Sequence, residues 1–235
     1  MSSPSPSSLR SPARPGSPVR DRTVARGVRA GVACGGLSLV LLGLVAAGWA
    51  PLLRLDRAVA EALHRRAVAD PGLVHANRIM TDWVWDPWTV RALLAVAVVV
   101  LWWKGARTTA GWVAATALLA SAVQQGVKAA VGRERPHWPD PVDLAHYAAF
   151  PSGHVMTLVV GSGVLLWLVH RAGARPAVRR GALALAGVSV VGVGFTRVFL
   201  GVHWLSDVVG GVLMGSCTVA FAVAARAAAR ARTGS

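Results

Sequence analysis

The sequence predicts an all-α, polytopic membrane protein with six transmembrane helices in one bundle. Of the 235 residues, 54% are hydrophobic and only 15% are charged, and the mean hydropathy is +0.51, which is too apolar for an ordinary soluble domain. Long stretches without charged residues also recur, at about the 20 residues that a helix needs to cross a hydrocarbon core. They lie between Arg29 and Arg54, Arg107 and Lys128, Arg180 and Arg197, and Asp207 and Arg226.

Six apolar segments follow from this pattern. They cover residues 28–50, 87–103, 108–128, 151–170, 181–200 and 204–225. The second segment is short and contains Arg91, so it can cross the membrane only if this side chain reaches the interface or faces protein. No internal repeat and no second domain is evident, and the six segments therefore form one domain.

The domain organisation predicted is a membrane domain between two tails. Residues 1–26 are rich in Ser, Pro and Arg, and we expect a disordered, basic cytoplasmic tail. Residues 27–226 hold the six-helix domain, and residues 227–235 form a short basic cytoplasmic tail. A cleavable signal peptide is the alternative at the amino end, but the apolar run exceeds the roughly 7–15 residues of a signal core, and no small-residue cleavage motif clearly ends it.

The distribution of charge predicts the orientation, because cytoplasmic loops retain Lys and Arg. With six spans, both termini lie on one side, and 15 of the 25 basic residues fall there: Arg10, Arg14, Arg20, Arg22, Arg26, Arg29, Lys104, Arg107, Arg171, Arg175, Arg179, Arg180, Arg226, Arg230 and Arg232. Every acidic residue except Asp21 falls on the opposite side or at its edge. Both termini are therefore predicted to be cytoplasmic. The bias toward Ala, Gly, Val and Arg is typical of a GC-rich bacterial gene, which indicates a bacterial plasma membrane.

The net charge of +15 does not require a nucleic-acid partner. It is spread over tails and short loops rather than gathered on a soluble face, and topology accounts for it. Membrane lipids with anionic headgroups are the expected partners of this charge. Cys34 and Cys217 lie inside spans without metal-ligand spacing, so we interpret both as small apolar residues. The oligomeric state is not encoded in any pattern of the sequence.

A further helix is predicted between the first two spans. In residues 52–70, Leu52, Leu55, Val59 and Leu63 recur at helical spacing with charges between them. This pattern is typical of an amphipathic helix on the outer membrane surface. Structural packing and a ramp for lipid access are equally compatible with it.

Polar residues gather at the outer ends of the last four spans, on one face of the membrane. They are Lys128, Arg135, Ser152, His154, Arg197, His203 and Asp207. Singly, several have simple alternatives: Lys128 can be an interface lysine, and Arg135 with Arg133 can belong to a solvated loop. His137 and His146 are expected to be loop histidines without a catalytic role. Arg197 is harder to dismiss, because an arginine inside an apolar span costs about 2.5–3.5 kcal/mol on insertion scales.

As a set, these residues suit a phosphate. Lys128, Arg135 and Arg197 can surround its oxygens, since guanidinium groups donate in a forked, bidentate manner. Ser152 and Gly153 stand at the start of a span, where free backbone N–H groups favour an anion. Gly153 also allows a close approach of ligand to backbone.

Two histidines supply the reactive groups of this set. His203 and Asp207 are four residues apart, so on a helix the carboxylate can keep one imidazole nitrogen protonated and leave the other as a nucleophile. His154, in the first turn of the fourth span, can donate a proton to a leaving group.

These residues form a three-part signature that resembles the type 2 phosphatidic acid phosphatase superfamily. The first part, Lys, six residues, then Arg-Pro, is KAAVGRERP from Lys128 to Pro136. The second, Pro-Ser-Gly-His, runs from Pro151 to His154, and the third is TRVFLGVHWLSD from Thr196 to Asp207. Thr196 replaces the usual serine but retains a hydroxyl group.

The resemblance implies a metal-independent lipid phosphatase without cofactors, whose active site lies at the extracytoplasmic ends of spans 3 to 6. His203 would form a phosphohistidine, Asp207 would orient it, and His154 would act as acid and then base. The remaining residues would bind the phosphoryl oxygens: Lys128, Arg135, Ser152, Gly153 and Arg197. Phosphatidic acid, a polyprenyl diphosphate such as undecaprenyl diphosphate, or a related lipid phosphate would be the substrate.

Three further possibilities stay open at this point. Soluble vanadium-dependent haloperoxidases use a similar anion site, although the membrane-spanning core disfavours that activity here. A transporter or a catalytically silent scaffold is the second possibility, disfavoured because the key residues lie at one face rather than near the midplane. The third concerns residues 137–150, a loop that either discriminates between headgroups or is merely solvated.

Overall fold

The computed structural model describes residues 18–233 of the chain, and within them all regular structure is helical. The elements in order are α1 (Pro18–Ala46), α2 (Ala50–Ala69), α3 (Pro71–Ile79), the π-helical turn η1 (Met80–Val84), α4 (Pro87–Trp103), α5 (Arg107–Val131), α6 (Gly153–Arg171), α7 (Pro176–Phe199) and α8 (Leu205–Thr233). The all-α prediction is confirmed.

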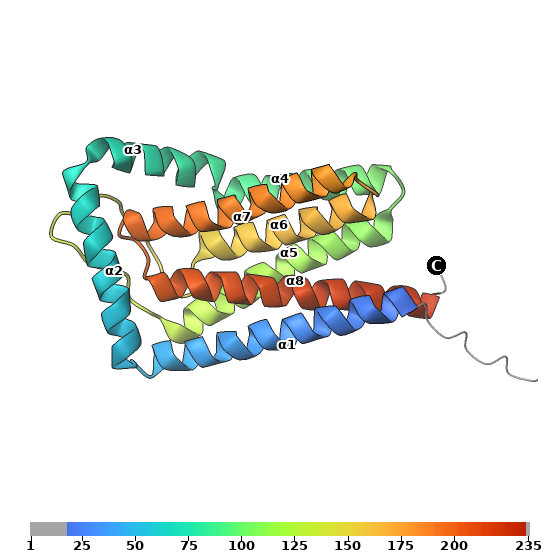
Figure 1. Ribbon diagram of the computed structural model, residues 1–235, viewed down its shortest axis with the longest axis horizontal. Helices are drawn as coiled ribbons and strands as arrows, with labels where there is room; N and C mark the ends of the chain where they lie inside the picture. Colours follow the sequence, from blue (N-terminus) through green and yellow to red (C-terminus); the bar gives the residue numbers. More distant parts are fainter. Residues whose placement is uncertain (1–17, 234–235) are drawn as a thin grey trace, which may run out of the picture.

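Six long helices lie side by side along the long axis of the molecule, and α2 crosses one end of this bundle (Figure 1). Helix α3 continues from α2 at the same end and leads through η1 into α4. Prolines at the first or second position start α2, α3, α4 and α7, where a missing N–H costs no hydrogen bond. At the C-terminal end of α5, Gly132 has a φ of 57° and its N–H donates to the carbonyl of Lys128. This is a left-handed cap, which glycine adopts readily.

Five helical runs in the described part of the chain are long and apolar enough to cross a membrane: Arg22–Ala46, Pro71–Trp103, Gly153–Arg171, Pro176–Phe199 and Leu205–Arg230. The weakest predicted span, 87–103, coincides with α4. The predicted span 108–128 coincides with α5, which is not among the five, and its polar residues include Gln124, Gln125 and Lys128. The helix is confirmed, whereas a sixth crossing stays a prediction.

The predicted tails are partly wrong. Helix α1 begins at Pro18, so residues 18–26 are helical rather than disordered, while residues 1–17 lie outside the described part. Helix α8 likewise runs to Thr233, through most of the expected carboxy-terminal tail. No glycine or proline interrupts the chain between Pro18 and Gly27. Packing of α1 against α8 stabilises both helices, so that each continues into its predicted tail.

The contact between α1 and α8 is the most extensive between any two described helices. Small residues of α1 face α8 at intervals of four: a Cβ on Gly27 would lie 2.9 Å from the Cβ of Ala224, and one on Gly31 would lie 2.8 Å from the ring of Phe221. Such small residues let two helix backbones approach closely in a membrane. Cys217 lies in this seam too, donating to the Gly31 carbonyl at 3.4 Å, in keeping with a small packing residue.

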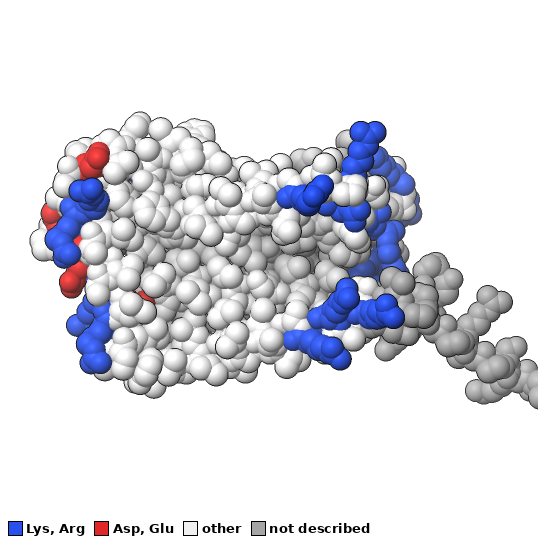
Figure 2. Space-filling view, viewed as in Figure 1, with Lys and Arg blue, Asp and Glu red and all other residues white. Residues whose placement is uncertain are grey.

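Charge divides the molecule along its long axis. On the face shown in Figure 2, the acidic side chains drawn in red lie at or near the end crossed by α2, whereas basic side chains drawn in blue lie at both ends. This arrangement agrees with the division of charge expected from the sequence. The choice of the opposite end as cytoplasmic rests on the excess of basic residues there.

Helix α2 is present as predicted, but its buried side is not the leucine stripe. The residues that it buries are Asp56, Ala60, His64 and Ala67, at spacings of four, four and three. Leu55, in contrast, is 51% exposed. Two polar side chains therefore point from α2 into the end of the bundle, where they meet the residues described next.

Candidate active site

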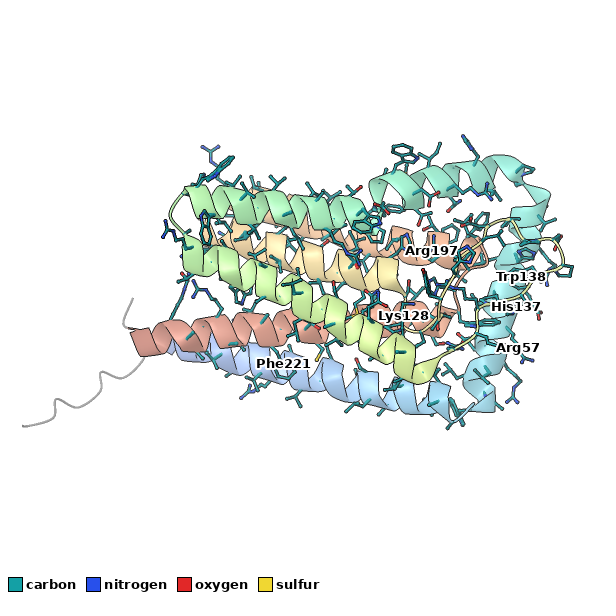
Figure 3. The ribbon with its side chains drawn as sticks, turned by 180° about the vertical axis from the view of Figure 1, so that it is seen from behind. Arg57, Lys128, His137, Trp138, Arg197 and Phe221 are labelled. Atoms are coloured by element: carbon teal, nitrogen blue, oxygen red, sulfur yellow. The ribbon has the colours of Figure 1, made fainter. Side chains whose placement is uncertain are left out.

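The predicted site residues converge beneath α2 at one end of the bundle. Lys128 lies near the end of α5, Arg135 in the connection that follows, His154 in the first turn of α6, Arg197 in the last turn of α7, and His203 in the connection to α8. Figure 3 shows Lys128 and Arg197 at this end, beside the connection that carries Trp138. The sequence motifs thus come from four neighbouring helix ends.

One cavity of about 290 Å³ joins most of them. Its lining includes Lys128, Arg135, Gly153, His154, Arg197 and His203. Two of the predicted residues, Ser152 and Asp207, are fully buried and are not part of this lining. Its lining therefore combines cations with both predicted catalytic histidines.

His203 is held at both ring nitrogens. Its Nδ1 is 3.2 Å from Oδ2 of Asp207, and its Nε2 is 3.2 Å from Nη1 of Arg135. Because Arg135 can only donate, Nε2 is the acceptor and the proton lies on Nδ1, shared with Asp207. This is the tautomer that leaves a lone pair on Nε2, and His203 lines the cavity.

The surroundings of His203 also favour its neutral form. Burial, followed by the positive charge of Arg135, lowers the pKa of His203 well below its usual value of 6.5. A neutral imidazole retains its lone pair, so the environment and the hydrogen bonds favour the same nucleophilic state.

Asp207 is fixed by more than His203. Its Oδ2 accepts from the backbone N–H of Trp204 at 2.9 Å, and its Oδ1 accepts from Nη1 of Arg133 at 2.6 Å. A carboxylate with three donors is strongly restrained in position. Its backbone carbonyl also accepts from Ser152 N–H at 2.9 Å, which ties the start of α6 to the first turn of α8.

Arg133 links Asp207 to α2. Its Nη2 is 2.7 Å from Oδ2 of Asp56, while its Nη1 also donates to Ser206 Oγ at 2.6 Å. Asp56 in turn accepts from the N–H of Ser206 at 2.9 Å and from its hydroxyl at 2.5 Å. We call Asp56, Arg133, Ser206 and Asp207 the carboxylate brace. All four are largely buried, and every charge in the brace has a partner.

Lys128, Arg135 and Arg197 form the opposite arrangement, which we call the cation cradle. Lys128 Nζ donates to the carbonyl of Ala148, and Arg135 donates to the carbonyls of His146, Tyr147 and Val202. Arg197 reaches Thr81 Oγ1 at 3.4 Å, and its Nε has no partner. Among the described residues, no carboxylate lies within 4.0 Å of any cradle nitrogen.

The start of α6 brings a histidine and a close backbone approach to the cavity. A Cβ on Gly153 would lie 2.8 Å from Nε2 of Gln124, so glycine lets the glutamine side chain lie against the start of α6. Ser152 is the N-cap of α6, and its buried Oγ has no partner in the described structure. Thr196, which stands at the serine position of the third motif, donates from its hydroxyl to the carbonyl of Val193 in its own helix.

The connection between α5 and α6 closes over this end of the bundle. Trp138 stacks on His64 with ring centroids 4.0 Å apart and donates to the Gly201 carbonyl at 2.9 Å. His64 also contacts Asp140 at 3.1 Å. The loop is thereby tied to α2 and to the connection that carries His203, and its residues His146 and Tyr147 contribute to the lining of the cavity.

Sequence reasoning missed part of this site. Arg133 is not a solvated loop residue as considered above, because its side chain is only 11% exposed and bridges two carboxylates. Asp56 was not singled out either. The spacing of Asp56 and His64 puts both on one face of α2, next to the leucines, and is the signal that could have indicated a polar contact with protein. Gln124, one helix turn before Lys128 on the same face of α5, is buried beside Gly153.

Known proteins with similar sequence or structure share this arrangement of helices. A family model described as the PAP2 superfamily matches residues 109–231. Phosphatidylglycerophosphatase B of Bacillus subtilis (strain 168) is 38% identical over 80 residues, which span 33% of this chain and 39% of that protein. The match therefore covers well under half of the relative's length.

A solved structure extends the similarity to most of the chain. The crystal structure of the first transmembrane PAP2 type phosphatidylglycerolphosphate phosphatase from Bacillus subtilis superposes with a TM-score of 0.72 over 82% of this chain and 93% of that chain, at 21% identity. At that identity the likeness establishes the fold. Since the family match covers more than half of the chain, the resemblance inferred from the motifs is confirmed, and this multi-pass membrane protein belongs to the PAP2 superfamily.

Proposed function

We propose that the protein is an integral membrane lipid phosphatase that works through a phosphohistidine. The observation that carries the proposal is the state of His203: Nδ1 faces Asp207 at 3.2 Å, Nε2 faces Arg135 at 3.2 Å, and His203 lines a cavity that Lys128, Arg197 and His154 also line. Membership of the PAP2 superfamily supports the reaction class, and the name of the B. subtilis relative supports a phosphorylated lipid as substrate.

In the first step, the phosphoryl oxygens lie in the cation cradle and His203 Nε2 attacks phosphorus. A bond from Nε2 to phosphorus forms, the bond from phosphorus to the leaving oxygen breaks, and His154 delivers its proton to that oxygen. A bound phosphate offsets the surrounding positive charge and so favours the protonated form of His154. Cations fixed before the reaction stabilise the charge that develops on the equatorial oxygens.

In the second step, His154 removes a proton from water, whose oxygen attacks the phosphohistidine and releases inorganic phosphate. Asp207 keeps the Nδ1 proton in place throughout, which preserves the reactive tautomer. Ser152 and Gly153 contribute the start of α6 to phosphate binding. No cofactor takes part in these steps, and we propose that none is needed.

The active site is proposed to face the extracytoplasmic side of a bacterial plasma membrane, with six crossings and both termini in the cytoplasm. The basic side chains at the far end of the bundle support this orientation (Figure 2). A lipid then presents its phosphate at headgroup depth, at the level of the cavity. Residues 137–150, which reach the rim, are proposed to help discriminate between headgroups.

Phosphate release from the purified protein in detergent and EDTA tests the proposal. Phosphatidic acid, a polyprenyl diphosphate, phosphatidylglycerophosphate and soluble phosphate esters serve as substrates. The parent should release phosphate, His203→Ala should lose nearly all activity while keeping its fold, and His137→Ala, a histidine outside the catalytic cavity, should retain it. Phosphate bound to protein and stable in alkali should be found after rapid quenching, because phosphohistidine is labile only in acid.

Other results would point to other functions. A well-folded parent that releases phosphate from no ester would favour the transporter or scaffold, and solute uptake into proteoliposomes would then be measured. Vanadate should inhibit phosphate release, since it mimics the five-coordinate state of phosphorus. Vanadate-dependent halide oxidation without phosphatase activity would favour the haloperoxidase chemistry.

A further inference from the structure

Arg91 is a cation for which neither the fold nor the proposed mechanism provides a role. It lies in the first half of α4 and is partly buried. Its guanidinium carbon lies 5.1 Å from the ring centroid of Trp88, and within the described residues no carboxylate forms an ion pair with it. An arginine in an apolar helix is costly unless it faces protein, water or an anion.

The side chain of Arg91 faces the catalytic cavity. Arg91 lines this cavity together with Trp88, Gln124 and Gln125, and Lys128 and His203 line the same cavity. Asp86, the carboxylate in this lining, caps α4: its Oδ2 accepts from the N–H groups of Trp88 and Thr89 at 2.8 and 3.0 Å. Arg91 and the two glutamines therefore offer donors to the cavity.

The size of the cavity leaves room beyond one phosphoryl group. Its volume is about 290 Å³, and since a water molecule occupies about 30 Å³ of liquid, the space corresponds to roughly ten water molecules. A phosphoryl group in the cation cradle contributes only four or so heavy atoms in the reacting state. The wall with Arg91 thus belongs to a cavity with room for the part of a substrate that departs from the phosphorus.

We propose that Arg91, with Gln125 and Trp88, forms a second anion subsite that binds a phosphate carried by the leaving group. This inference rests on the proposed phosphatase function and narrows its substrate class. In a lipid diphosphate, the leaving group is a lipid monophosphate. In phosphatidylglycerophosphate, the leaving alcohol carries a phosphodiester. Phosphatidic acid, whose leaving group is an uncharged diacylglycerol, gives Arg91 nothing to bind.

The test compares three substrates, a lipid diphosphate, phosphatidylglycerophosphate and phosphatidic acid. Each is measured with the parent, with Arg91→Gln and with a matched control variant. Arg107→Gln is the control, because Arg107 also lies over a tryptophan, 5.3 Å from the ring of Trp102, but is not in the cavity lining. A charge-assisted hydrogen bond is worth about tenfold to a hundredfold, so Arg91→Gln should lower kcat/KM by at least about tenfold for substrates whose leaving group carries phosphate. The value for phosphatidic acid should change less than about threefold, and Arg91→Lys should recover part of the loss.

The lipid diphosphate and phosphatidylglycerophosphate distinguish two possible ligands of the subsite, the phosphate of a leaving lipid monophosphate and a phosphodiester. Selective loss with the diphosphate alone, or with the phosphodiester alone, supports the subsite and identifies its ligand. An equal loss with all three lipids, including phosphatidic acid, would overturn the proposal in favour of a general role in folding or charge. No loss with any lipid would overturn it as well.

A binding measurement separates failure of the subsite from failure of the proposed function. If the parent hydrolyses no ester, the phosphatase proposal fails, yet the stabilisation of the folded protein by pyrophosphate and by phosphate can still be compared. The subsite predicts a larger thermal shift with pyrophosphate, and loss of that difference in Arg91→Gln but not in Arg107→Gln. Equal shifts with both anions in an inactive parent would overturn the subsite too.

Discussion

The carboxylate brace and the cation cradle lie at the same end of the bundle and both contain largely buried arginines, yet their charges are in opposite states. In the brace, Arg133 lies within 2.7 Å of both Asp56 and Asp207, and each charge is satisfied by the chain itself. In the cradle, three cations lie around a cavity, and among the described residues no carboxylate lies within 4.0 Å of their nitrogens. Burying like charges without partners is unfavourable, so the cradle is complete only when an anion occupies it. The brace is complete without a ligand.

The comparison predicts that the two regions respond differently to loss of one charge. Arg197→Gln should have the largest effect on activity, lowering kcat roughly 10²–10³-fold, as expected for the loss of one preorganised donor to the transition state. Its midpoint of thermal unfolding should stay equal to that of the parent or rise, because repulsion within the cradle is reduced. A marked fall in the midpoint would show that Arg197 is structurally paired and would contradict the comparison.

The brace should respond mainly in stability. Asp56→Asn leaves the buried Arg133 with one carboxylate fewer, and breaking a buried pair costs up to roughly 3–5 kcal/mol. We expect a lower unfolding midpoint in detergent and a fall of about tenfold in kcat, with KM nearly unchanged, because Asp207 is less well positioned.

A double-mutant cycle sharpens this second prediction. Combining Asp56→Asn with Arg133→Gln removes both charges of the pair, so the two effects on stability should be less than additive. The matched control is Asp140→Asn, which removes a carboxylate that contacts α2 from an exposed loop position. Additive losses in the cycle, or an equal loss in the control, would show that the brace is not a coupled unit.

Anions should stabilise the protein through the cradle. Phosphate or vanadate at about 100 times its dissociation constant should add about 2.7 kcal/mol to the free energy of unfolding. The shift should persist in Asp56→Asn, whose cradle is intact, and be lost in Arg197→Gln. Differential scanning fluorimetry in detergent measures the shift in the parent and in both variants. An unchanged shift in Arg197→Gln would show that the anion binds outside the cation cradle.

The smallest expected effect concerns pH. Burial and Arg135 lower the pKa of His203 from 6.5, so its neutral, nucleophilic form persists as the pH falls through 6.5 and is lost only at lower pH. The acid limb of kcat/KM assigned to His203 in the free enzyme should therefore lie below pH 6.5. An acid limb above that value would indicate that His203 is less buried, or less exposed to positive charge, than in this structure.

The sequence predicts the fold and the reactive residues well because both depend on local patterns. Apolar stretches between charges located the helices, and the spacing of His203 and Asp207 indicated their contact. The brace could not be predicted in this way, since Asp56 and Arg133 are 77 residues apart and meet only because α2 folds across the end of the bundle. The same crossing explains why the polar side of α2 is buried, whereas its leucines suggested the reverse. From the sequence, Arg91 is only an unfavourable charge within the predicted span 87–103. The structure accounts for this charge by placing Arg91 in the lining of the cavity.

The seam between α1 and α8 has a consequence for the order in which the protein assembles. Gly27 and Ala224 meet there, so the first helix gains its main partner only after the last one has been synthesised and inserted. That last helix also carries Asp207 in its first turn. A chain interrupted before α8 therefore leaves α1 without its partner and His203 without its orienting carboxylate. Insertion of α8 therefore completes the bundle and orients His203 in the same late step. A nascent or truncated chain without α8 has no correctly oriented nucleophile.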